Sequence, residues 1–442
     1  HFLICSVLLP FSMALEGLAC LESLPRDDDD SRFVKSFDCV DNISTARAVE
    51  FFNKYGFVVL RSVFDSSECE RTREAMWSIL ESGNPEFKHN DQTTWGTMKS
   101  KGNYGLSTRG PSFHPVLVNN RQNEKLARAL HALVSSPDPC SEDVHTKDPS
   151  SDIGDLIVSH DRFTVYRATV LDEELQGAVD GAQFSTGDRN IHLDMNPWWW
   201  LESSTDILKG LETLQYKHKV DPPVAVDSTG EATSSVGGAD VKAAKKAAKA
   251  SAAVNEHADF VRENNMVVEC MGRHVQCVMN FLPNLPEDGG TLVVPMFHKY
   301  MRKYCEDCKH LRKPLPWVQF SKEVEEVLLA HAHRVPMREG SVLVWDQRVA
   351  HGTAPNTSST CRMAQYLKAG LRSKTFPVDR ASSIDGTGSG EASMDSNTPS
   401  VPVSSRLLRR STALDYILRQ NNARDIVTPL GEKLFALDVL PK

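Results

Sequence analysis

Apolar residues recur along the chain in short runs that are either apolar throughout or alternate between apolar and polar positions. Such runs are typical of β-strands, because successive side chains of a strand point to opposite faces. Turn residues such as Gly289-Gly290 separate several of the runs. The predicted strands are Gly56–Leu60, Phe163–Val170, His274–Leu282, Thr291–Pro295, Gly340–Trp345 and Arg362–Leu371.

Longer segments with apolar positions three and four residues apart predict helices, most of them near the front of the chain. They are Ala46–Asn53, the segment from the N-cap candidate Asp65 to about Ser82, Asn119–Val134 and Lys322–Ala332. Strands separated by turns, with helices mostly at the front, predict a mainly β protein with helical additions (α+β). An antiparallel sandwich or jelly roll fits this order.

The polarity of the remaining segments divides the chain. We expect residues 1–30 to be a leader or a disordered N-terminus, 31–375 a single domain, 376–411 a flexible linker rich in Ser, Gly, Thr and Pro, and 412–442 a segment that packs on the core. Residues 221–256 and 301–333 are predicted insertions. The Ala- and Lys-rich part of the first insertion has no apolar face to bury, which favours a solvated segment over a basic docking patch.

Composition narrows the class of protein. A net charge of -8 and a pI near 6.0 argue against a dedicated nucleic-acid binder, which is usually basic. Ten scattered cysteines in 442 residues favour a reducing compartment over a disulfide framework. No run reaches the roughly 18 apolar residues of a membrane helix. We therefore expect an intracellular, cytoplasmic protein, although the apolar stretch Phe2–Leu15 leaves a signal or targeting peptide as an alternative. The composition does not indicate an oligomeric state.

Candidate chemistry centres on His192 and Asp194, which lie two positions apart and would therefore project from the same face of a strand. A distant histidine, His351, is the candidate third member. Two imidazoles and one carboxylate are the ligands of the facial triad that holds non-haem Fe(II). Three protein ligands leave positions free for a chelating cosubstrate and dioxygen. A strand histidine beside a surface aspartate, with no metal, is the alternative.

Residues near His351 suit a cosubstrate. Arg362 follows it by eleven positions, far enough to sit on the next strand of a hairpin, and its planar guanidinium can clamp a carboxylate. Thr353 would add a hydroxyl from the same side as His351. Gln276 shares a strand face with Asn280; we expect the glutamine to contact the metal-bound cosubstrate, while a hydrogen-bonded core amide is equally compatible.

Three residues are candidates for the substrate pocket. They are Asn280, Tyr166 on the strand before the His-x-Asp pair, and Trp198 in the run of tryptophans after it. Trp198 has core packing as its favoured alternative. The spacing Cys305-x-x-Cys308 invites comparison with zinc sites, but the second ligand pair that zinc requires is missing nearby, so free thiols are the better interpretation.

The chain resembles the phytanoyl-CoA dioxygenase-like enzymes from about Phe51 to Leu371. The matching motifs are Phe51-Phe52-x-x-x-Gly56-Phe57-Val58-Val59-Leu60, the His192/Asp194 pair, Asp288-Gly289-Gly290-Thr291-Leu292-x-x-x-Pro295 with His298, and His351, Thr353 and Arg362. The chain departs from the family in the 158 residues between His192 and His351, which the two insertions explain, and at Met296-Phe297, where the family often has Gly-Ser.

This resemblance implies a double-stranded β-helix, which is a cupin-like jelly roll, flanked by N-terminal helices. It implies that His192, Asp194 and His351 bind Fe(II), and that Arg362 with Thr353 binds the far carboxylate of 2-oxoglutarate. With O2, such an enzyme hydroxylates or otherwise oxidises a small organic or lipid-like substrate. The alternatives are a cupin-like metalloprotein without 2-oxoglutarate, an inactive jelly-roll binding protein, and an interaction module that works through residues 221–256.

Overall fold

The computed structural model describes most of the predicted domain and the C-terminal segment. The described residues are 23–98, 111–140, 152–175, 179–185, 190–201, 257–258, 261, 273–312, 317–375 and 405–441. The predicted insertion at 221–256 and most of the predicted linker lie outside these residues. None of the helices within them is both long and apolar enough to cross a membrane.

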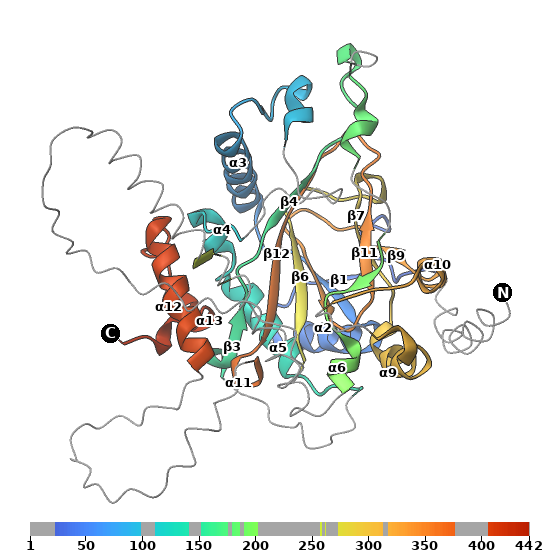
Figure 1. Ribbon diagram of the computed structural model, residues 1–442, viewed down its shortest axis with the longest axis vertical. Coiled ribbons are helices and arrows are strands. Elements are labelled where there is room, and N and C mark those ends of the chain that lie inside the picture. Colours follow the sequence, from blue (N-terminus) through green and yellow to red (C-terminus); the bar gives the residue numbers. More distant parts are fainter. Residues whose placement is uncertain are drawn as a thin grey trace, which may run out of the picture.

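The described strands form two sheets (Figure 1). The larger sheet contains, in spatial order, β1 (Ser36–Phe37), β2 (Phe57–Leu60), β10 (Val342–Asp346), β6 (Val275–Asn280), β12 (Arg362–Leu371) and β3 (Leu156–Val158), and β4 (Phe163–Tyr166) also pairs with β12. The smaller sheet contains β8 (Val318–Gln319), β5 (His192–Leu193), β11 (His351–Ala354), β7 (Gly290–Val293) and β9 (His333–Arg334). Apart from the β1–β2 pair, the strands are antiparallel.

Side chains from both sheets share one inner space. Val278 of β6 and Leu343 of β10 belong to the same buried cluster as Val293 of β7. Their strand neighbours Cys277 and Val344 belong to a second cluster on the opposite face of the larger sheet. Because side chains alternate along a strand, this division assigns every strand residue to the inner or the outer face. The two facing antiparallel sheets confirm the predicted mainly β jelly roll with helical additions.

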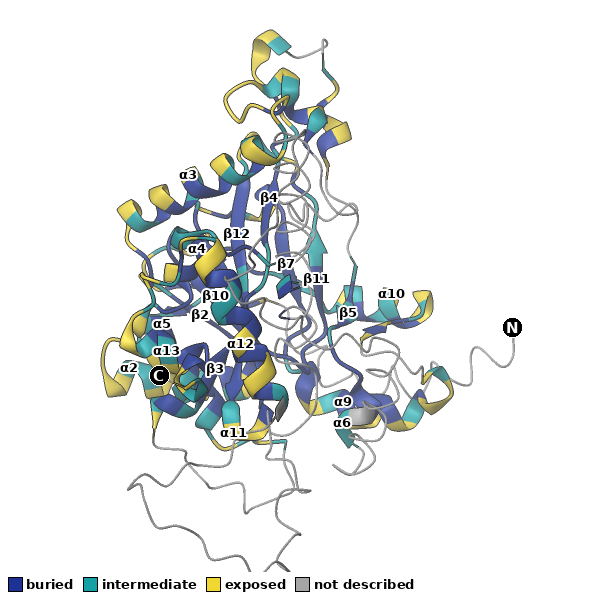
Figure 2. Ribbon diagram, turned by 60° about the vertical axis from the view of Figure 1, so that its left-hand side comes forward, coloured by how far each residue is buried: buried dark blue, intermediate teal, exposed yellow. Residues whose placement is uncertain are grey.

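Helices cover both outer faces. Figures 1 and 2 place one group beside the larger sheet and another beside the smaller sheet, and Figure 2 shows buried strands between helices with exposed outer surfaces. The first group is α2 (Asn42–Tyr55), α3 (Ser66–Gly83), α4 (Pro115–Asn120), α5 (Glu124–Ser135), α12 (Ser405–Gln420) and α13 (Pro429–Leu434). The second is α6 (Pro197–Leu201), α9 (Phe297–Asp307) and α10 (Lys322–Ala330); a short α11 (Arg372–Thr375) follows β12.

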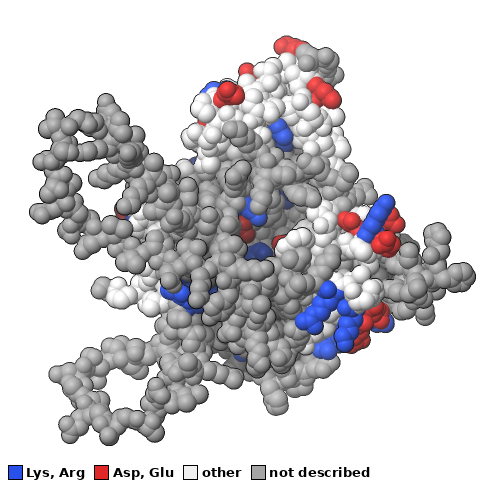
Figure 3. Space-filling view, viewed as in Figure 1, with Lys and Arg blue, Asp and Glu red and all other residues white. Residues whose placement is uncertain are grey.

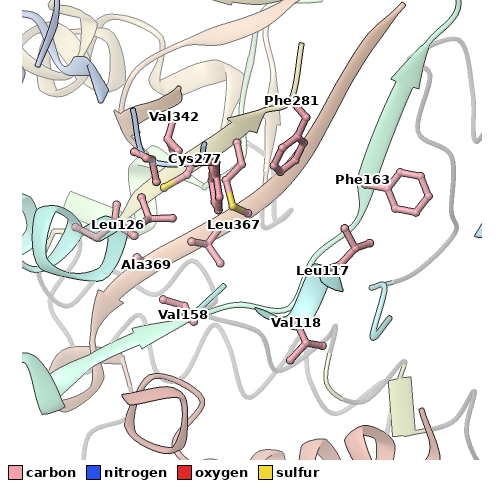
Figure 4. Close-up of a cluster of buried hydrophobic side chains, with 14 of the residues drawn as sticks. Leu117, Val118, Leu126, Val158, Phe163, Cys277, Phe281, Val342, Leu367 and Ala369 are labelled. Atoms are coloured by element: carbon pink, nitrogen blue, oxygen red, sulfur yellow. The ribbon is translucent and has the colours of Figure 1, made fainter. Parts of the chain in front are cut away.

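The outer face of the larger sheet carries the main hydrophobic core. Figure 4 shows Leu117 of α4 and Leu126 of α5 in one hydrophobic cluster with Leu367 and Ala369 of β12, and all four side chains are buried. Capping residues fix where these helices begin. Asp65 forms a complete capping box with Glu68 at the start of α3, as its N-cap position predicted. Asn123 caps α5, so the single helix predicted over 119–134 is divided into α4 and α5.

Three predicted boundaries change. Residues from Leu24 onward are packed, because Leu24 is buried between the sheets and Asp27 accepts hydrogen bonds from Ser36 and Arg338. Residues 301–333 are more than an insertion, since β8 pairs with β5 and β9 with β7. Helix α12 begins at Ser405, inside the predicted linker. The structured parts of these segments were not predicted, because short strands and helix ends with many polar residues show no clear apolar pattern.

A buried group of two acids and two arginines holds the turn from β10 to β11. Arg348 donates to both carboxylate oxygens of Asp346, at 2.8 and 2.6 Å, and its Nη1 lies 2.8 Å from Asp138. Arg273 lies 3.4 Å from Asp346 and 3.2 Å from Asp138. Burial alone would raise the pKa of Asp346, but the two arginines hold it well below its usual range. We call these four residues the buried charge cluster.

Replacing Asp346 with Asn would leave Arg348 and Arg273 short of one buried negative charge. We expect the free energy of unfolding to fall by about 3–5 kcal/mol, the usual cost of removing one partner of a buried ion pair. Denaturant unfolding measures it. The matched control is Glu124→Gln, which removes an exposed ion pair with Arg128 and should cost less than about 1 kcal/mol. An equally small loss for Asp346→Asn would contradict this account of the turn.

Candidate active site

Two histidines meet across the smaller sheet. His192 of β5 and His351 of β11 are direct partners in the antiparallel pairing, and their ring centroids are 4.5 Å apart. Their chain neighbours Leu193 and Ala350 belong to a buried cluster on the outer face of the smaller sheet, which we call the outer cluster. Both imidazoles therefore face the inner space. The strand register therefore brings together two residues that have 158 residues between them in the sequence.

Asp194 joins the pair from just beyond the end of β5. The strand ends at Leu193, and Asp194 lies in the bend that precedes α6. The strand was predicted to include Asp194, so it ends one residue earlier than predicted. Its Oδ1 lies 3.5 Å from Nε2 of His192, and its Oδ2 lies 3.9 Å from Nε2 of His351. One potential ligand atom from each of the three residues lies within 4.8 Å of the others. This arrangement can hold a metal ion.

Backbone carbonyls orient both imidazoles. Nδ1 of His192 lies 3.1 Å from the carbonyl oxygen of Asn190, and Nδ1 of His351 lies 3.0 Å from that of Val349. A neutral imidazole that donates through Nδ1 carries its lone pair on Nε2. Both Nε2 atoms face Asp194. The backbone thus selects the tautomer that a metal ligand requires.

Burial and neighbouring charges set the ionisation of the three groups. Burial lowers the pKa of His351 to about 3, so this imidazole is neutral at pH 7. Burial acts the same way on His192, but the hydrogen bond and charge of Asp194 outweigh it and raise the pKa. Burial by itself would raise the pKa of Asp194, yet the charge of Lys368 and the contact with His192 hold it well below its usual range. The carboxylate is therefore ionised and available to a cation.

Arg362 lies inside the same space, but not on the predicted hairpin. Strand β11 pairs with β5 and β7, whereas β12 pairs with β6, β3 and β4, so Arg362 approaches from the opposite sheet. The chain crosses between the sheets because a jelly roll alternates its strands between two layers. The Arg362 side chain is buried, and its Nη2 donates to the Thr291 hydroxyl at 3.3 Å.

The rest of the guanidinium has no partner. Nε and Nη1 of Arg362 make no hydrogen bond within the described part of the chain. The carbon at the centre of the group lies 4.9 Å from the centroid of the Tyr166 ring, and the hydroxyls of Tyr166 and Thr353 also make no hydrogen bond within the described part of the chain. Burial raises the pKa of Tyr166, so this phenol stays neutral. A buried cation with two free donor atoms is a site for an anion.

The Asp288-Gly289-Gly290-Thr291 motif makes room for this arginine. A Cβ atom on Gly290 would lie 2.6 Å from Nε of Arg362 and 2.9 Å from Nη2 of Arg334, and the φ angle of Gly290 is 116°. Both the space and the backbone conformation therefore require glycine. Arg334 is committed elsewhere, because it donates to backbone carbonyls, including those of Val335 and Leu285. Burial lowers its pKa to about 9.

The remaining predicted site residues have different positions. Gln276 faces the inner space and its amide nitrogen has no hydrogen-bond partner among the described residues. Asn280 shares that face, but its amide donates to the carbonyls of Leu282 and Arg338, so its role is to hold a turn. Trp198 lies in the outer cluster, where its indole donates to the Cys305 carbonyl at 3.0 Å. The pocket role expected for Trp198 is therefore wrong, and the packing alternative is right.

A lysine that was not predicted from the sequence lies at the site. Nζ of Lys368 lies 3.6 Å from Oδ2 of Asp194. Lys368 lies on β12 at the same alternation phase as Arg362, and that shared phase in a mostly apolar strand was the signal that could have found it. Figure 3 shows charged atoms of both signs inside a hollow near the middle of this face of the molecule.

Comparisons with solved structures find distant likenesses. A crystal structure of EctD from S. alaskensis with 2-oxoglutarate and 5-hydroxyectoine has a TM-score of 0.39 and 13% sequence identity, covering 80% of this chain and 84% of that chain. SnoK, described as a non-haem α-ketoglutarate-dependent carbocyclase from nogalamycin biosynthesis, has a TM-score of 0.38 and 13% identity, covering 73% of this chain and 83% of that chain. The fold assignment rests on the strand pairing and not on these scores.

Comparisons of sequence are more specific. The model of the family described as phytanoyl-CoA dioxygenase (PhyH) matches residues 231–364, which include His351 and Arg362. A Dictyostelium discoideum protein with the provisional name of phytanoyl-CoA dioxygenase is 28% identical over 340 residues, which are 76% of this chain and 76% of that protein. These two findings confirm the resemblance to the phytanoyl-CoA dioxygenase family that the sequence motifs indicated.

Proposed function

We propose that this protein is an Fe(II)- and 2-oxoglutarate-dependent dioxygenase. It would hydroxylate or otherwise oxidise an unactivated C–H bond of a small organic or lipid-like substrate, with release of succinate and CO2. The observation that carries the proposal is the placement of an unpartnered buried arginine, Arg362, in the same inner space as the His192, Asp194 and His351 cluster. The PhyH match and the Dictyostelium relative support a dioxygenase-like activity.

The residues present fit both groups. Two neutral imidazole nitrogens and one carboxylate are the donor set of non-haem Fe(II) sites, and they leave coordination positions open. Nε and Nη1 of Arg362 lie on different edges of the guanidinium, and Nη1 is free to donate to one carboxylate of a dicarboxylic acid. Thr291 and Thr353 face each other on β7 and β11 and place their hydroxyls on the same side. A dicarboxylate could thus reach from the arginine toward the metal.

Each residue then has a defined part. His192, Asp194 and His351 would hold the iron, and Arg362 with Thr353 would bind the far carboxylate of 2-oxoglutarate. When bound, Fe(II) and 2-oxoglutarate together activate O2 for oxidation of the substrate. The protein keeps the imidazoles in one tautomer through Asn190 and Val349, and it excludes bulk water by burying Arg362 and His351. A single oxygenase domain that includes the packed residues from Leu24 onward, and an intracellular location, are parts of the proposal.

Two other functions lack the same support. A cupin-like metalloprotein that binds no 2-oxoglutarate would have no use for a buried arginine whose donor atoms are unpaired. A jelly-roll binding protein without activity would have no use for two imidazoles turned toward one carboxylate. Arg362 therefore distinguishes the proposed enzyme from the first alternative, and the His192, Asp194 and His351 cluster distinguishes it from the second.

Anaerobic addition of Fe(II) and 2-oxoglutarate tests the proposal directly. The wild-type protein should develop the visible charge-transfer band of the iron-bound cosubstrate. His192→Ala removes one ligand from the cluster and should abolish the band. His310→Ala, which changes an exposed histidine, is the matched control and should keep it. A wild-type protein without the band, or a His192→Ala protein with it, would rule out the proposed centre. Succinate release in air without substrate then measures uncoupled turnover.

Gly290→Ala should weaken the binding of 2-oxoglutarate more than the binding of Fe(II). The added methyl group would displace the Arg362 guanidinium, and we expect the dissociation constant of 2-oxoglutarate to rise at least about tenfold, equivalent to about 1.4 kcal/mol. Titration of the charge-transfer band with 2-oxoglutarate measures it. Gly83→Ala is the control, because nothing lies within 4 Å of a Cβ atom at that position. Equal 2-oxoglutarate affinities in the two variants would show that Arg362 is not the clamp.

A further inference from the structure

Three hydrogen-bond donors lie side by side across the larger sheet. Lys368 of β12 is the register partner of Gln276 on β6, and Gln276 is the register partner of Trp345 on β10. All three face the inner space: Gln276 shares the face of Val278, the Lys368 ammonium contacts Asp194, and the Trp345 ring lies 5.0 Å from the His351 ring. We call these three residues the donor row.

Two members of the donor row have no acceptor among the described residues. The Gln276 side-chain nitrogen and the Trp345 indole nitrogen are buried, and neither has a hydrogen-bond partner in the part of the chain that the structure describes. Gln276 and Trp345 are only 4% and 3% exposed. A buried donor without an acceptor costs about 1–3 kcal/mol, and two of them in adjacent register positions are unusual in a stable fold. Such donors are retained where a ligand supplies the acceptor.

The charge of Lys368 indicates what kind of ligand this is. Its partner in the structure is Asp194, which is also the carboxylate of the proposed iron centre. When a divalent cation binds Asp194, the ammonium lies beside a positive centre and loses that compensation. The charges of Fe(II) and Arg362 are then balanced by Asp194 and the two carboxylates of 2-oxoglutarate. Arg334 is offset separately by the buried carboxylate of Asp288. Lys368 remains as one positive charge in excess.

We propose that Lys368, Gln276 and Trp345 form a subsite that binds an anionic oxygen group of the substrate, a carboxylate or a phosphate, beside the metal. The inference rests on the proposed function and narrows its substrate to an organic anion. The subsite combines one charge with two neutral donors, which is the composition that selects a negatively charged oxygen over a neutral one. Lys368 is the member that is partly exposed, at 27% of its side chain, so a ligand from solvent can reach it.

Small anions test the subsite without knowledge of the substrate. Acetate, inorganic phosphate and the neutral analogue acetamide are titrated into the anaerobic protein saturated with Fe(II) and 2-oxoglutarate, so that Arg362 is already occupied. Calorimetry measures binding, and the charge-transfer band reports whether the iron environment changes. We expect acetate or phosphate to bind to the wild-type protein and acetamide not to bind. The better of the two anions indicates which group the substrate carries.

Variants assign the binding to the donor row. Lys368→Met preserves the length of the side chain and should weaken anion binding at least tenfold, and Trp345→Phe, which removes only the indole donor, should weaken it less. Lys299→Met, an exposed lysine on α9, is the matched control. Circular dichroism of Lys368→Met and Trp345→Phe shows that both variants fold, and the charge-transfer band shows whether each still forms the iron centre.

Three results would overturn the subsite. They are no binding of acetate or phosphate to the wild-type protein, equal binding by wild type and Lys368→Met, and a tenfold loss of affinity for 2-oxoglutarate or Fe(II) in Lys368→Met. The last result would mean that the donor row serves the cosubstrate or Asp194. If the wild-type protein shows no charge-transfer band, this result contradicts the proposed function instead. The anion titration is then repeated on the metal-free protein, where it tests the subsite separately.

Discussion

The candidate active site depends on the buried charge cluster at the corner between β10 and β11. This corner carries the chain from the larger sheet to the smaller one, and four residues separate Asp346 from His351. The cluster fixes the corner through ion pairs from the loop after α5 and from the start of β6, through Asp138 and Arg273. The carbonyl of Val349, which orients the imidazole of His351, lies within the same corner. The ion pairs of the buried charge cluster thus help to set the orientation of the His351 imidazole, which is a proposed metal ligand.

The molecule uses buried charge in two opposite ways. In the buried charge cluster each acid faces arginine and each arginine faces acid, so the desolvation cost is offset within the fold. In the inner space Arg362 keeps two free donor atoms, and Gln276 and Trp345 keep one each. Unpaired groups of this kind lower the stability of the empty protein. Ligands that supply hydrogen-bond acceptors would recover this cost.

The alternation of apolar and polar residues and the spacing of apolar residues predicted those strands and helices that depend on local sequence. The strand Arg362–Leu371 and the helix after Asp65 could be predicted closely, because a continuous pattern and a capping box fix them. The pairing of strands could not, since nothing local indicates that β11 and β12 lie in different sheets. For this reason Arg362 was predicted on a strand that pairs with the strand of His351, whereas its strand lies in the opposite sheet. For Trp198 packing was the favoured interpretation, and the helix that begins at Pro197 places its side chain in a buried cluster.

Lys368 links the metal and the anion in a way that neither motif suggests. In the structure its ammonium lies beside Asp194 and helps to keep that carboxylate ionised, which prepares the site for a cation. A bound cation competes with the lysine for the same carboxylate. The lysine is then free for an anion, and an anion that draws it away leaves Asp194 to the cation. Because coupling between two binding equilibria is reciprocal, each ligand must strengthen the binding of the other. A substrate recognised through Lys368 would therefore bind best to the metal-loaded protein, which is the form that can oxidise it.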